Sequence, residues 1–211
     1  SPRDRLLLAF LSAAIGFYEL DIGLTSIGWP VFDERILSQP GVALLVTIFM
    51  VGGVAHSTNI IDGFHGLLLG TSILVLAAFI WVMTEIGGSL LITYAGIMLG
   101  ALLGIFCLNF PKGKIFMGDG GAYLIGFLLA VLALLLVKNH STVSPWFPLL
   151  VLSYPIYETI FSIFRKKIVR RQPAMLPDKL HLHMFVYHYL GNTIGEKLWI
   201  NQNAATSIVI G

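Results

Sequence analysis

The most restrictive feature of this sequence is a series of apolar runs, each about as long as a helix that crosses a lipid bilayer. A hydrocarbon core of ~30 Å takes ~20 apolar residues in helical form. By that measure the sequence predicts six spans, at residues 6–20, 41–58, 66–84, 89–109, 121–137 and 146–164. Hydrophobic residues make up 56% of the 211 residues and charged residues only 11%. The expected fold class is therefore all-α, a polytopic transmembrane helix bundle.

Both ends of the chain suggest a piece of a longer membrane protein. Hydrophobicity is rising again from Trp199 to the last residue, Gly211, which predicts a partial seventh span. At the other end Ser1 stands in place of an initiator methionine, and the charged residues after it do not form the start of a signal peptide. We expect one transmembrane domain over residues 1–211, truncated at both ends, and no second soluble domain.

The basic residues are distributed unevenly between the two sides that alternating spans would create. One side receives eleven of the thirteen Lys and Arg residues, and the other receives only Arg35 and Lys138. The eleven are Arg3, Arg5, Lys112, Lys114, Arg165, Lys166, Lys167, Arg170, Arg171, Lys179 and Lys197. Because cytoplasmic loops carry the excess of Lys and Arg, this side is predicted to be cytoplasmic. The net charge of +2 thus reflects topology and indicates no nucleic-acid partner.

Two aspartates lie at junctions between predicted spans on this side. Asp62 lies in Asn59-Ile60-Ile61-Asp62-Gly63, and Asp119 lies in Phe116-Met117-Gly118-Asp119-Gly120-Gly121. One interpretation is a helix N-cap, in which each carboxylate accepts a backbone N–H and complements the helix dipole. The other is a metal–phosphate site, because magnesium binds oxygens from one or two carboxylates and from substrate phosphates at once. The local sequence leaves both interpretations open.

A basic stretch and a pair of histidines follow the last complete span. Arg170 and Arg171 end the basic stretch, and His181 and His183 are two positions apart in a later motif. Residues 165–190 are expected to form a cytoplasmic loop that carries this motif. The two imidazoles share a side only if the chain there is extended. The surrounding cations favour an anion over zinc, which takes three or four protein ligands, and two ordinary histidines in an interfacial loop are the alternative.

Other features have structural explanations. Three glycines at every fourth position, Gly96, Gly100 and Gly104, predict a face for close helix packing. Pro155 predicts a kink in the sixth span. Glu158, one turn further on, is expected to neutralise Arg165 or to hydrogen-bond to another helix, in preference to a catalytic role.

Four motifs, in this order and at these intervals, resemble those of one enzyme family. They are Asn59-Ile-Ile-Asp62-Gly63-Phe-His-Gly66-Leu67, Phe116-Met-Gly-Asp119-Gly-Gly121, Pro155-Ile-Tyr-Glu158-Thr159 and Asp178-Lys-Leu-His181-Leu-His183. The resemblance, which covers essentially the whole chain, is to the polyprenyl-phosphate N-acetylhexosamine-1-phosphate transferases. This superfamily includes the undecaprenyl-phosphate GlcNAc-1-phosphate transferases and the phospho-MurNAc-pentapeptide translocase. It implies a bundle of about ten or eleven transmembrane helices with a cytoplasmic active site.

The resemblance implies roles for residues at the two span junctions. Asp62 and Asp119 match catalytic aspartates of the family, and Asp119 matches the one that binds magnesium. Asn59 is expected to line the pocket for the nucleotide and diphosphate together with Asp62. Phe116 matches the aromatic residue that stacks on uracil.

The resemblance also implies that the last cytoplasmic loop binds substrate. His181 and His183 match the histidine motif that holds the diphosphate and sugar of the donor. Arg170 and Arg171 lie in the same loop and are expected to bind substrate as well, although they match the family pattern less closely.

The implied reaction is transfer of an N-acetylhexosamine 1-phosphate from a UDP-sugar to undecaprenyl phosphate, with release of UMP. Such a step initiates the synthesis of a cell-surface polysaccharide or of the cell wall, in the bacterial inner membrane. The implied cofactor is Mg²⁺, with Mn²⁺ as the alternative. The implied partners are a UDP-N-acetylhexosamine, undecaprenyl phosphate, the lipid bilayer and, by analogy with relatives, a second copy in a homodimer.

The sequence also departs from the family pattern. The family's acidic pair precedes a Ser-Pro-Arg-like turn and so would lie upstream of Ser1, which means that this chain alone is expected to be inactive. His56, His65 and Met184 stand where an asparagine, an aspartate and a third histidine are common. These changes favour an enzyme of surface-polysaccharide synthesis over the muramyl-pentapeptide branch.

Two other classes of protein compete with a transferase. A catalytically silent membrane scaffold would keep the fold and these motifs but lack the acidic pair. A membrane transporter would place polar residues and broken helices near the bilayer midplane. Here the acids lie at one face and the sequence shows no inverted repeat, so the transferase is favoured.

Overall fold

The computed structural model describes residues 2–24, 26–87, 89–171, 181–193 and 202–210. All regular structure within these ranges is helical, which confirms the all-α class. The elements are α1 (Pro2–Glu19), α2 (Pro30–Phe32), η1 (Asp33–Leu37), α3 (Pro40–Ile61), α4 (Leu67–Ile86), α5 (Ser89–Asn109), α6 (Gly118–Asn139), α7 (Trp146–Val151), α8 (Ser153–Phe164), η2 (Arg165–Val169), α9 (Leu182–Thr193) and α10 (Gln202–Ile210), where η marks a π-helical turn.

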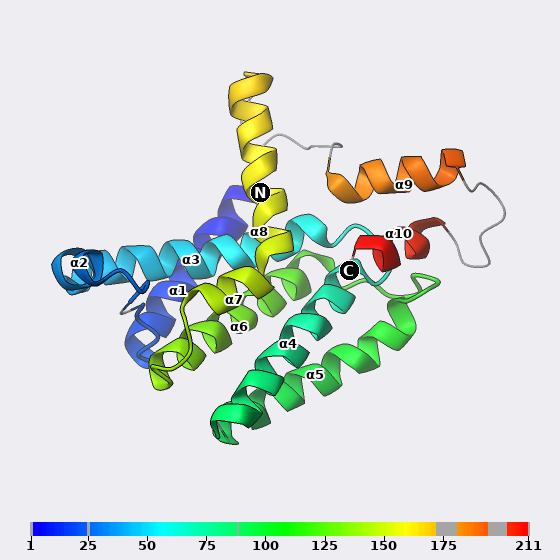
Figure 1. Cartoon of the computed structure of the whole chain (residues 1–211). Coiled ribbons are helices and arrows are strands. Elements are labelled where there is room, and N and C mark those ends of the chain that lie inside the picture. Colours follow the sequence, from blue (N-terminus) through cyan, green and yellow to red (C-terminus); the bar gives the residue numbers. More distant parts are fainter. Residues whose placement is uncertain (1, 25, 88, 172–180, 194–201, 211) are drawn as a thin grey trace.

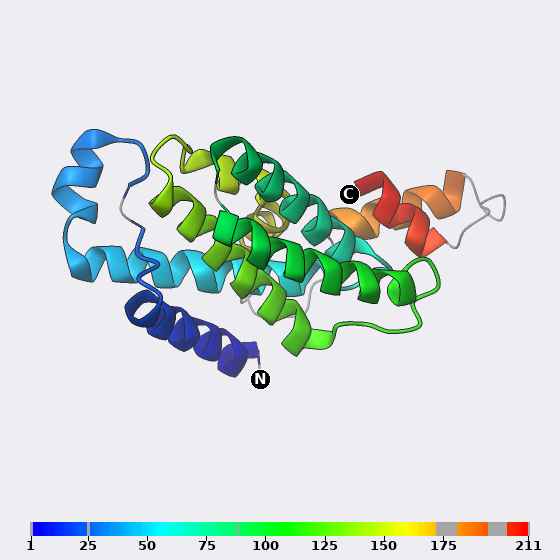
Figure 2. The ribbon, with the colours of Figure 1, turned by 90° about the horizontal axis from the view of Figure 1, so that it is seen from below.

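Four of the described helices are long and apolar enough to cross a membrane, and they correspond to the second to fifth predicted spans. They are α3, α4, residues Leu90–Asn109 of α5, and α6. α3 makes its most extensive contacts with α6 and α1, and α4 packs along α5 (Figures 1 and 2). Since α3, α4, α5 and α6 alternate in direction, the turn 62–66 and the connection 110–117 lie at the same end of the bundle.

The first and sixth predicted spans do not meet this criterion. α1 has charged residues, Asp4 and Arg5, in its first turns. The sixth is broken into α7 and α8, which meet at Leu152. Pro155 has no N–H to donate to the carbonyl of Val151, and its ring crowds that carbonyl. The predicted kink is therefore a complete break, after which α8 rises steeply from the rest of the bundle (Figure 1).

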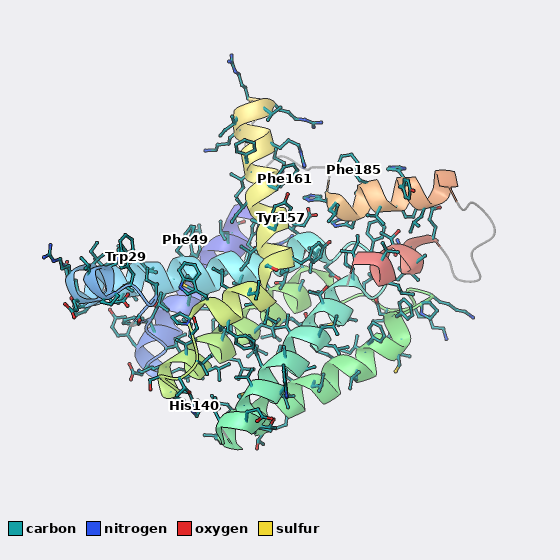
Figure 3. All side chains as sticks on the ribbon, in the orientation of Figure 1. Trp29, Phe49, His140, Tyr157, Phe161 and Phe185 are labelled. Atoms are coloured by element: carbon teal, nitrogen blue, oxygen red, sulfur yellow. The ribbon has the colours of Figure 1, made fainter. Side chains whose placement is uncertain are left out.

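The outer surface of the bundle is rich in large apolar and aromatic side chains. The labelled aromatic residues in Figure 3 lie on the outside of the helices, and five of them are at least two-fifths exposed: Trp29, Phe49, Tyr157, Phe161 and Phe185. Water-soluble proteins rarely expose contiguous apolar area on this scale. The surface is the one expected of helices that face lipid.

The glycine stripe on α5 does not pack as the sequence predicted. A Cβ built at Gly96, Gly100 or Gly104 would have no described atom within 4 Å apart from its own chain neighbours and helix backbone, so the prediction of close packing is wrong for the described chain. The close helix approach occurs instead at Gly126 on α6. A Cβ there would lie 2.7 Å from Cα of Ala55 on α3.

Two sequence predictions lie outside the described residues. One is the 178–180 half of the histidine motif, and the other is the start of the seventh span near Trp199. The described part of that predicted span is the nine-residue helix α10, which packs against α9 and α4.

Candidate functional site

The turn between α3 and α4, residues 62–66, is the centre of the candidate site. The ring of Phe64 lies edge-on to His183, with centroids 5.0 Å apart. The ring of His65 lies edge-on to Phe116, with centroids 5.4 Å apart. Gly66 takes a positive φ of 82°, and a Cβ there would lie 2.7 Å from the ring of Phe110, so this position requires glycine. One turn thus contacts both of the other predicted site segments.

Asp62 ends α3 and is only partly exposed to solvent. It is the C-terminal cap residue of α3, whereas Gly66 precedes the first residue of α4. The N-cap interpretation is therefore wrong for Asp62. Burial, and secondly the negative charge of Asp119, raise the pKa of the Asp62 carboxyl to about 6. The two predicted catalytic aspartates are therefore close enough to repel each other.

Asp119 lies in the first turn of α6. The helix begins at Gly118 and Met117 precedes it, so Asp119 is inside the helix and is not its N-cap. Its half-exposed carboxylate forms an ion pair with the guanidinium of Arg5 on α1. A carboxylate at this place also complements the positive end of the α6 dipole.

Asn59 adds a third oxygen to this part of the site. It precedes Asp62 by three residues, which places both on one side of the end of α3. Its Oδ1 atom is buried and has no hydrogen-bond partner among the described residues. A buried acceptor without a partner costs about 1–3 kcal/mol, so a ligand that supplies a positive charge or a donor would stabilise this arrangement.

The oxygens of Asp62, Asp119 and Asn59 fit magnesium better than a transition metal. Within the described residues, no group of three His, Cys, Asp or Glu side chains could hold a metal ion. Magnesium does not need such a group, because it is usually held by one or two carboxylates and completes its shell with water and phosphate oxygens. The donor set therefore agrees with a magnesium ion shared with a phosphate substrate.

The two histidines of the motif lie together in a cluster of polar side chains. His181 precedes α9 and His183 lies in its first turn, yet their rings stack with centroids 5.2 Å apart and an interplanar angle of 11°. An extended chain is thus not needed to bring them together. His183 is buried, and burial, followed by repulsion from His181, lowers its pKa to about 4. The neutral form of His183 is the stable one at neutral pH.

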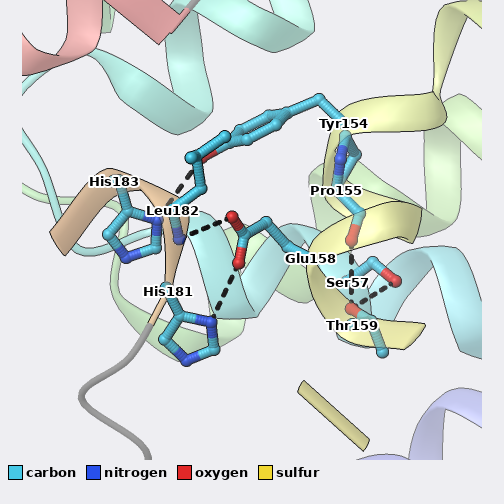
Figure 4. A network of polar contacts seen from close by, with 8 residues as sticks. All are labelled: Ser57, Tyr154, Pro155, Glu158, Thr159, His181, Leu182 and His183. Atoms are coloured by element: carbon cyan, nitrogen blue, oxygen red, sulfur yellow. Dashed lines mark hydrogen bonds and ion pairs between the residues drawn. The ribbon is translucent and has the colours of Figure 1, made fainter. Parts of the chain in front are cut away.

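Glu158 on α8 also belongs to this cluster, although the sequence predicted only a structural role for it. It is buried and accepts a hydrogen bond from Nδ1 of His181 at 3.1 Å and from the backbone N of Leu182 at 2.8 Å (Figure 4). This confirms the prediction of a bond to another helix. The motif Pro155-Ile-Tyr-Glu158 was the signal that marked it.

The remaining predicted residues differ in how they join the site. Phe116 is 45% exposed and contacts His65, so one face of the ring is available to a ligand. Arg170 and Arg171 are exposed and follow η2, at the far end of the segment that rises from the bundle in Figure 1. The structure does not bring these two arginines to the 62–66 turn. Arg5, by contrast, was predicted only as a topology signal and lies at the site.

A cavity of about 390 Å³ opens beside Asp119 between α1, α3 and α6. Arg5 and Asp119 form its polar end, and its apolar wall includes Leu8, Leu124 and Phe127. Tyr123 also lines it, and the Tyr123 hydroxyl lies 2.8 Å from Nδ1 of His56 on α3. The cavity therefore joins a charged end to an apolar interior.

The fold and the site together define a polytopic membrane protein with paired carboxylates and imidazoles at one end of its bundle. The model of the glycosyl transferase family 4 matches residues 1–137. The chain belongs to this family, which confirms the resemblance seen in the sequence.

Curated relatives come from several bacteria. The chain is 37% identical to the probable undecaprenyl-phosphate N-acetylglucosaminyl 1-phosphate transferase of Bacillus subtilis, over 82% of this chain and 48% of the relative. It is 29% identical to the undecaprenyl-phosphate alpha-N-acetylglucosaminyl 1-phosphate transferase of Escherichia coli K12, over 84% and 50%. It is 33% identical to the phospho-N-acetylmuramoyl-pentapeptide-transferase of Leuconostoc mesenteroides, over 59% and 40%. The chain thus spans about half the length of the curated relatives it matches.

Proposed function

We propose that this chain forms part of an Mg²⁺-dependent transferase that moves N-acetylhexosamine 1-phosphate from a UDP-sugar to undecaprenyl phosphate and releases UMP. The observation that carries the proposal is that the 62–66 turn contacts His183 through Phe64 and Phe116 through His65, while Asp119 in α6 pairs with Arg5. The names of the relatives support the sugar phosphate and the lipid acceptor. The sequence-based prediction that eleven of the thirteen Lys and Arg residues lie on the side of this turn supports a cytoplasmic site in the bacterial inner membrane.

The proposed catalytic roles follow from the charge and the hydrogen-bonding atoms of each side chain. Asp62, Asp119 and the Asn59 oxygen would hold magnesium, which when bound neutralises charge on the donor diphosphate. A phosphate oxygen of the acceptor forms a bond to the β-phosphorus of the donor. The bond from that phosphorus to the bridging oxygen breaks, and UMP leaves with the electron pair. Positioned cations and hydrogen-bond donors stabilise the charge that develops on the transferring group.

Side chains around the turn would orient the donor. The imidazoles of His181 and His183 would donate hydrogen bonds to the diphosphate, and the half-exposed ring of Phe116 would stack on the uracil. Arg170 and Arg171 would have to approach from the rising end of α8 and η2, so they are the weakest members of the proposed site. A dimer and Mn²⁺ as an alternative metal stay predictions.

The cavity beside Asp119 suits the lipid acceptor. Its polar end contains Arg5, whose charge would attract the acceptor phosphate, and its apolar wall would receive the start of a prenyl chain. This placement would set the acceptor phosphate next to the carboxylates that hold the metal.

The test is UMP release by the intact protein in membranes that contain undecaprenyl phosphate, from a panel of UDP-sugars with and without magnesium. Magnesium-dependent release from one donor, lost in the Asp119→Asn variant, would support the transferase and name its sugar. No release from any donor by folded protein would favour a silent scaffold or a transporter.

A further inference from the structure

Both histidines of the motif are held through the same ring atom by one face of α8. Nδ1 of His181 lies 3.1 Å from Oε2 of Glu158, and Nδ1 of His183 lies 3.3 Å from the hydroxyl of Tyr154. Tyr154 and Glu158 are four residues apart, so they lie one above the other on the helix. Figure 4 shows both rings turned with Nδ1 toward α8.

In Figure 4 the carboxylate of Glu158 forms hydrogen bonds only with residues of the histidine motif. Its side chain is only 2% exposed, and a buried carboxylate is costly unless both oxygens are hydrogen-bonded. One oxygen accepts from His181, and the other accepts from the backbone N of Leu182, the first residue of α9. The carboxylate therefore fixes both the ring of His181 and the start of the helix that carries His183.

These bonds determine which nitrogen of each ring is free. An ionised carboxylate only accepts, so Nδ1 of His181 must carry a proton. The Tyr154 hydroxyl hydrogen-bonds to Nδ1 of His183, whichever of the two atoms is the donor. In both rings Nε2 is then the nitrogen left for a ligand, and Figure 4 draws both Nε2 atoms on the same side of the stacked rings. A phosphate oxygen only accepts hydrogen bonds, so Nε2 must also carry a proton when phosphate binds. His181 then binds as an imidazolium whose charge Glu158 balances, and His183 binds as the neutral Nε2–H tautomer, with the Tyr154 hydroxyl donating to its Nδ1.

We infer that Glu158 and Tyr154 are positioning residues, which orient His181 and His183 so that both Nε2 atoms face the phosphate groups of the donor. The inference rests on the proposed function, since it assigns the two residues to the donor site of that reaction. A carboxylate behind a functional histidine fixes its tautomer and ring orientation, and its loss typically costs ~10- to 100-fold in affinity or activity.

A neighbouring residue supplies a matched control. Thr159 follows Glu158 on α8, and its hydroxyl donates to Oγ of Ser57 on α3 at 2.9 Å and to the carbonyl of Pro155 at 3.0 Å. It attaches α8 to the bundle and contacts neither histidine in Figure 4. Thr159→Val therefore disturbs α8 without touching the hydrogen bonds of the imidazoles.

The experiment compares Glu158→Gln with Thr159→Val in the intact protein. Gln keeps an acceptor for the N–H of Leu182 but offers an N–H to His181, so Nδ1 of His181 must become the acceptor and the proton moves to Nε2. The ¹⁵N NMR spectrum of histidine-labelled protein, with His181 assigned from His181→Asn, should show a protonated Nδ1 in the parent and in Thr159→Val and an unprotonated Nδ1 in Glu158→Gln. An Nε2–H tautomer in the parent would overturn the inference.

Kinetics with the donor sugar nucleotide give the second readout. Glu158→Gln should lower kcat/KM for the donor by ~10- to 100-fold while its melting temperature falls no further than that of Thr159→Val, and Tyr154→Phe should raise the donor KM by a smaller factor. Equal losses in Thr159→Val, or parental kinetics in Glu158→Gln, would show that α8 is merely structural. The tautomer is measured without turnover, so a parent that lacks transferase activity tests the proposed function separately.

Discussion

At the scale of single residues, the unusual feature is that two acidic groups are placed close together at one end of the bundle. Burial and the charge of Asp119 raise the pKa of Asp62 to about 6, and Asn59 has a buried oxygen without a partner. Each fact alone is an ordinary cost of folding. Together they describe a site that a bound cation would stabilise, which is the physical argument for the proposed magnesium.

Asp119→Asn is expected to abolish transfer. The amide keeps the shape of the side chain and its place beside Arg5, but it removes the charge that attracts a divalent cation. The rate of UMP release should be measured over a wide range of magnesium concentrations. A near-normal rate at ordinary magnesium would show that Asp119 is not the metal ligand.

Asp62→Asn is expected to slow transfer while it stabilises the metal-free protein. A loss of at least two decades in rate corresponds to ~2.7 kcal/mol of barrier. The folded pKa of this carboxyl is raised, so the folded state binds the proton more tightly and its stability falls as the pH rises from about 4 to 6. Since the side chain is partly exposed, the gain from Asn above pH 6 should be only ~1 kcal/mol after solvent screening.

The two effects of Asp62→Asn are measured separately. Thermal unfolding at pH 5 and pH 8 without divalent cations should show a larger stabilisation at the higher pH. A rate loss of about tenfold or less, in a folded variant, would show that Asp62 only caps the end of α3 and has no catalytic role.

At the scale of elements, the position of the acids depends on how closely α3 and α6 approach. α3 ends just before Asp62 and α6 begins just before Asp119, and the two helices touch where Gly126 faces Ala55. The hydroxyl of Thr58 on α3 also donates to the carbonyl of Ala122 on α6 at 2.9 Å. This contact fixes the distance between the two carboxylates.

Gly126→Ala is expected to force α3 and α6 apart. The new methyl would meet backbone atoms, Cα of Ala55 at 2.7 Å and O of Val54 at 2.9 Å, which cannot rotate away. Overpacking of this kind costs ~1–3 kcal/mol, and transfer should fall because the carboxylates separate. Gly100→Ala on α5 is the control, since nothing lies within 4 Å of its added Cβ. Equal melting temperatures and rates for the two variants would contradict the assigned role of the α3–α6 contact.

The local pattern of the sequence predicted the elements better than it predicted their contacts. Hydropathy located the four long spans because lipid exposure acts on each helix separately. It did not reveal that α8 leaves the bundle at Leu152, nor that the glycines of α5 lie unpacked, because both depend on neighbours distant in sequence. Likewise the aspartates and histidines were predicted from motifs, whereas the ion pair of Arg5 with Asp119 joins segments whose proximity no local pattern encodes.

At the scale of the whole molecule, alternation of the long helices places Asp62, Phe116 and Asp119 at one end. The turn 62–66 and the connection 110–117 contact each other through His65, which lies against Phe116 and whose Nδ1 is 3.0 Å from the carbonyl of Pro111. The connection 140–145, at the other end of α6, belongs to the opposite face. The function proposed here therefore requires one definite orientation in the membrane.

Cysteine labelling tests that orientation. Cys107 is the only cysteine, so in a Cys107→Ala background Lys114→Cys and Ser141→Cys place single exposed thiols at opposite ends of α6. The predicted excess of basic residues on the cytoplasmic side puts Lys114 inside the cell and Ser141 outside. A maleimide that does not cross membranes should label Ser141→Cys in intact spheroplasts and Lys114→Cys only after permeabilisation. The reverse pattern would place the carboxylates on the outer face, where cytoplasmic UDP-sugars do not reach them, and would contradict the transferase proposal.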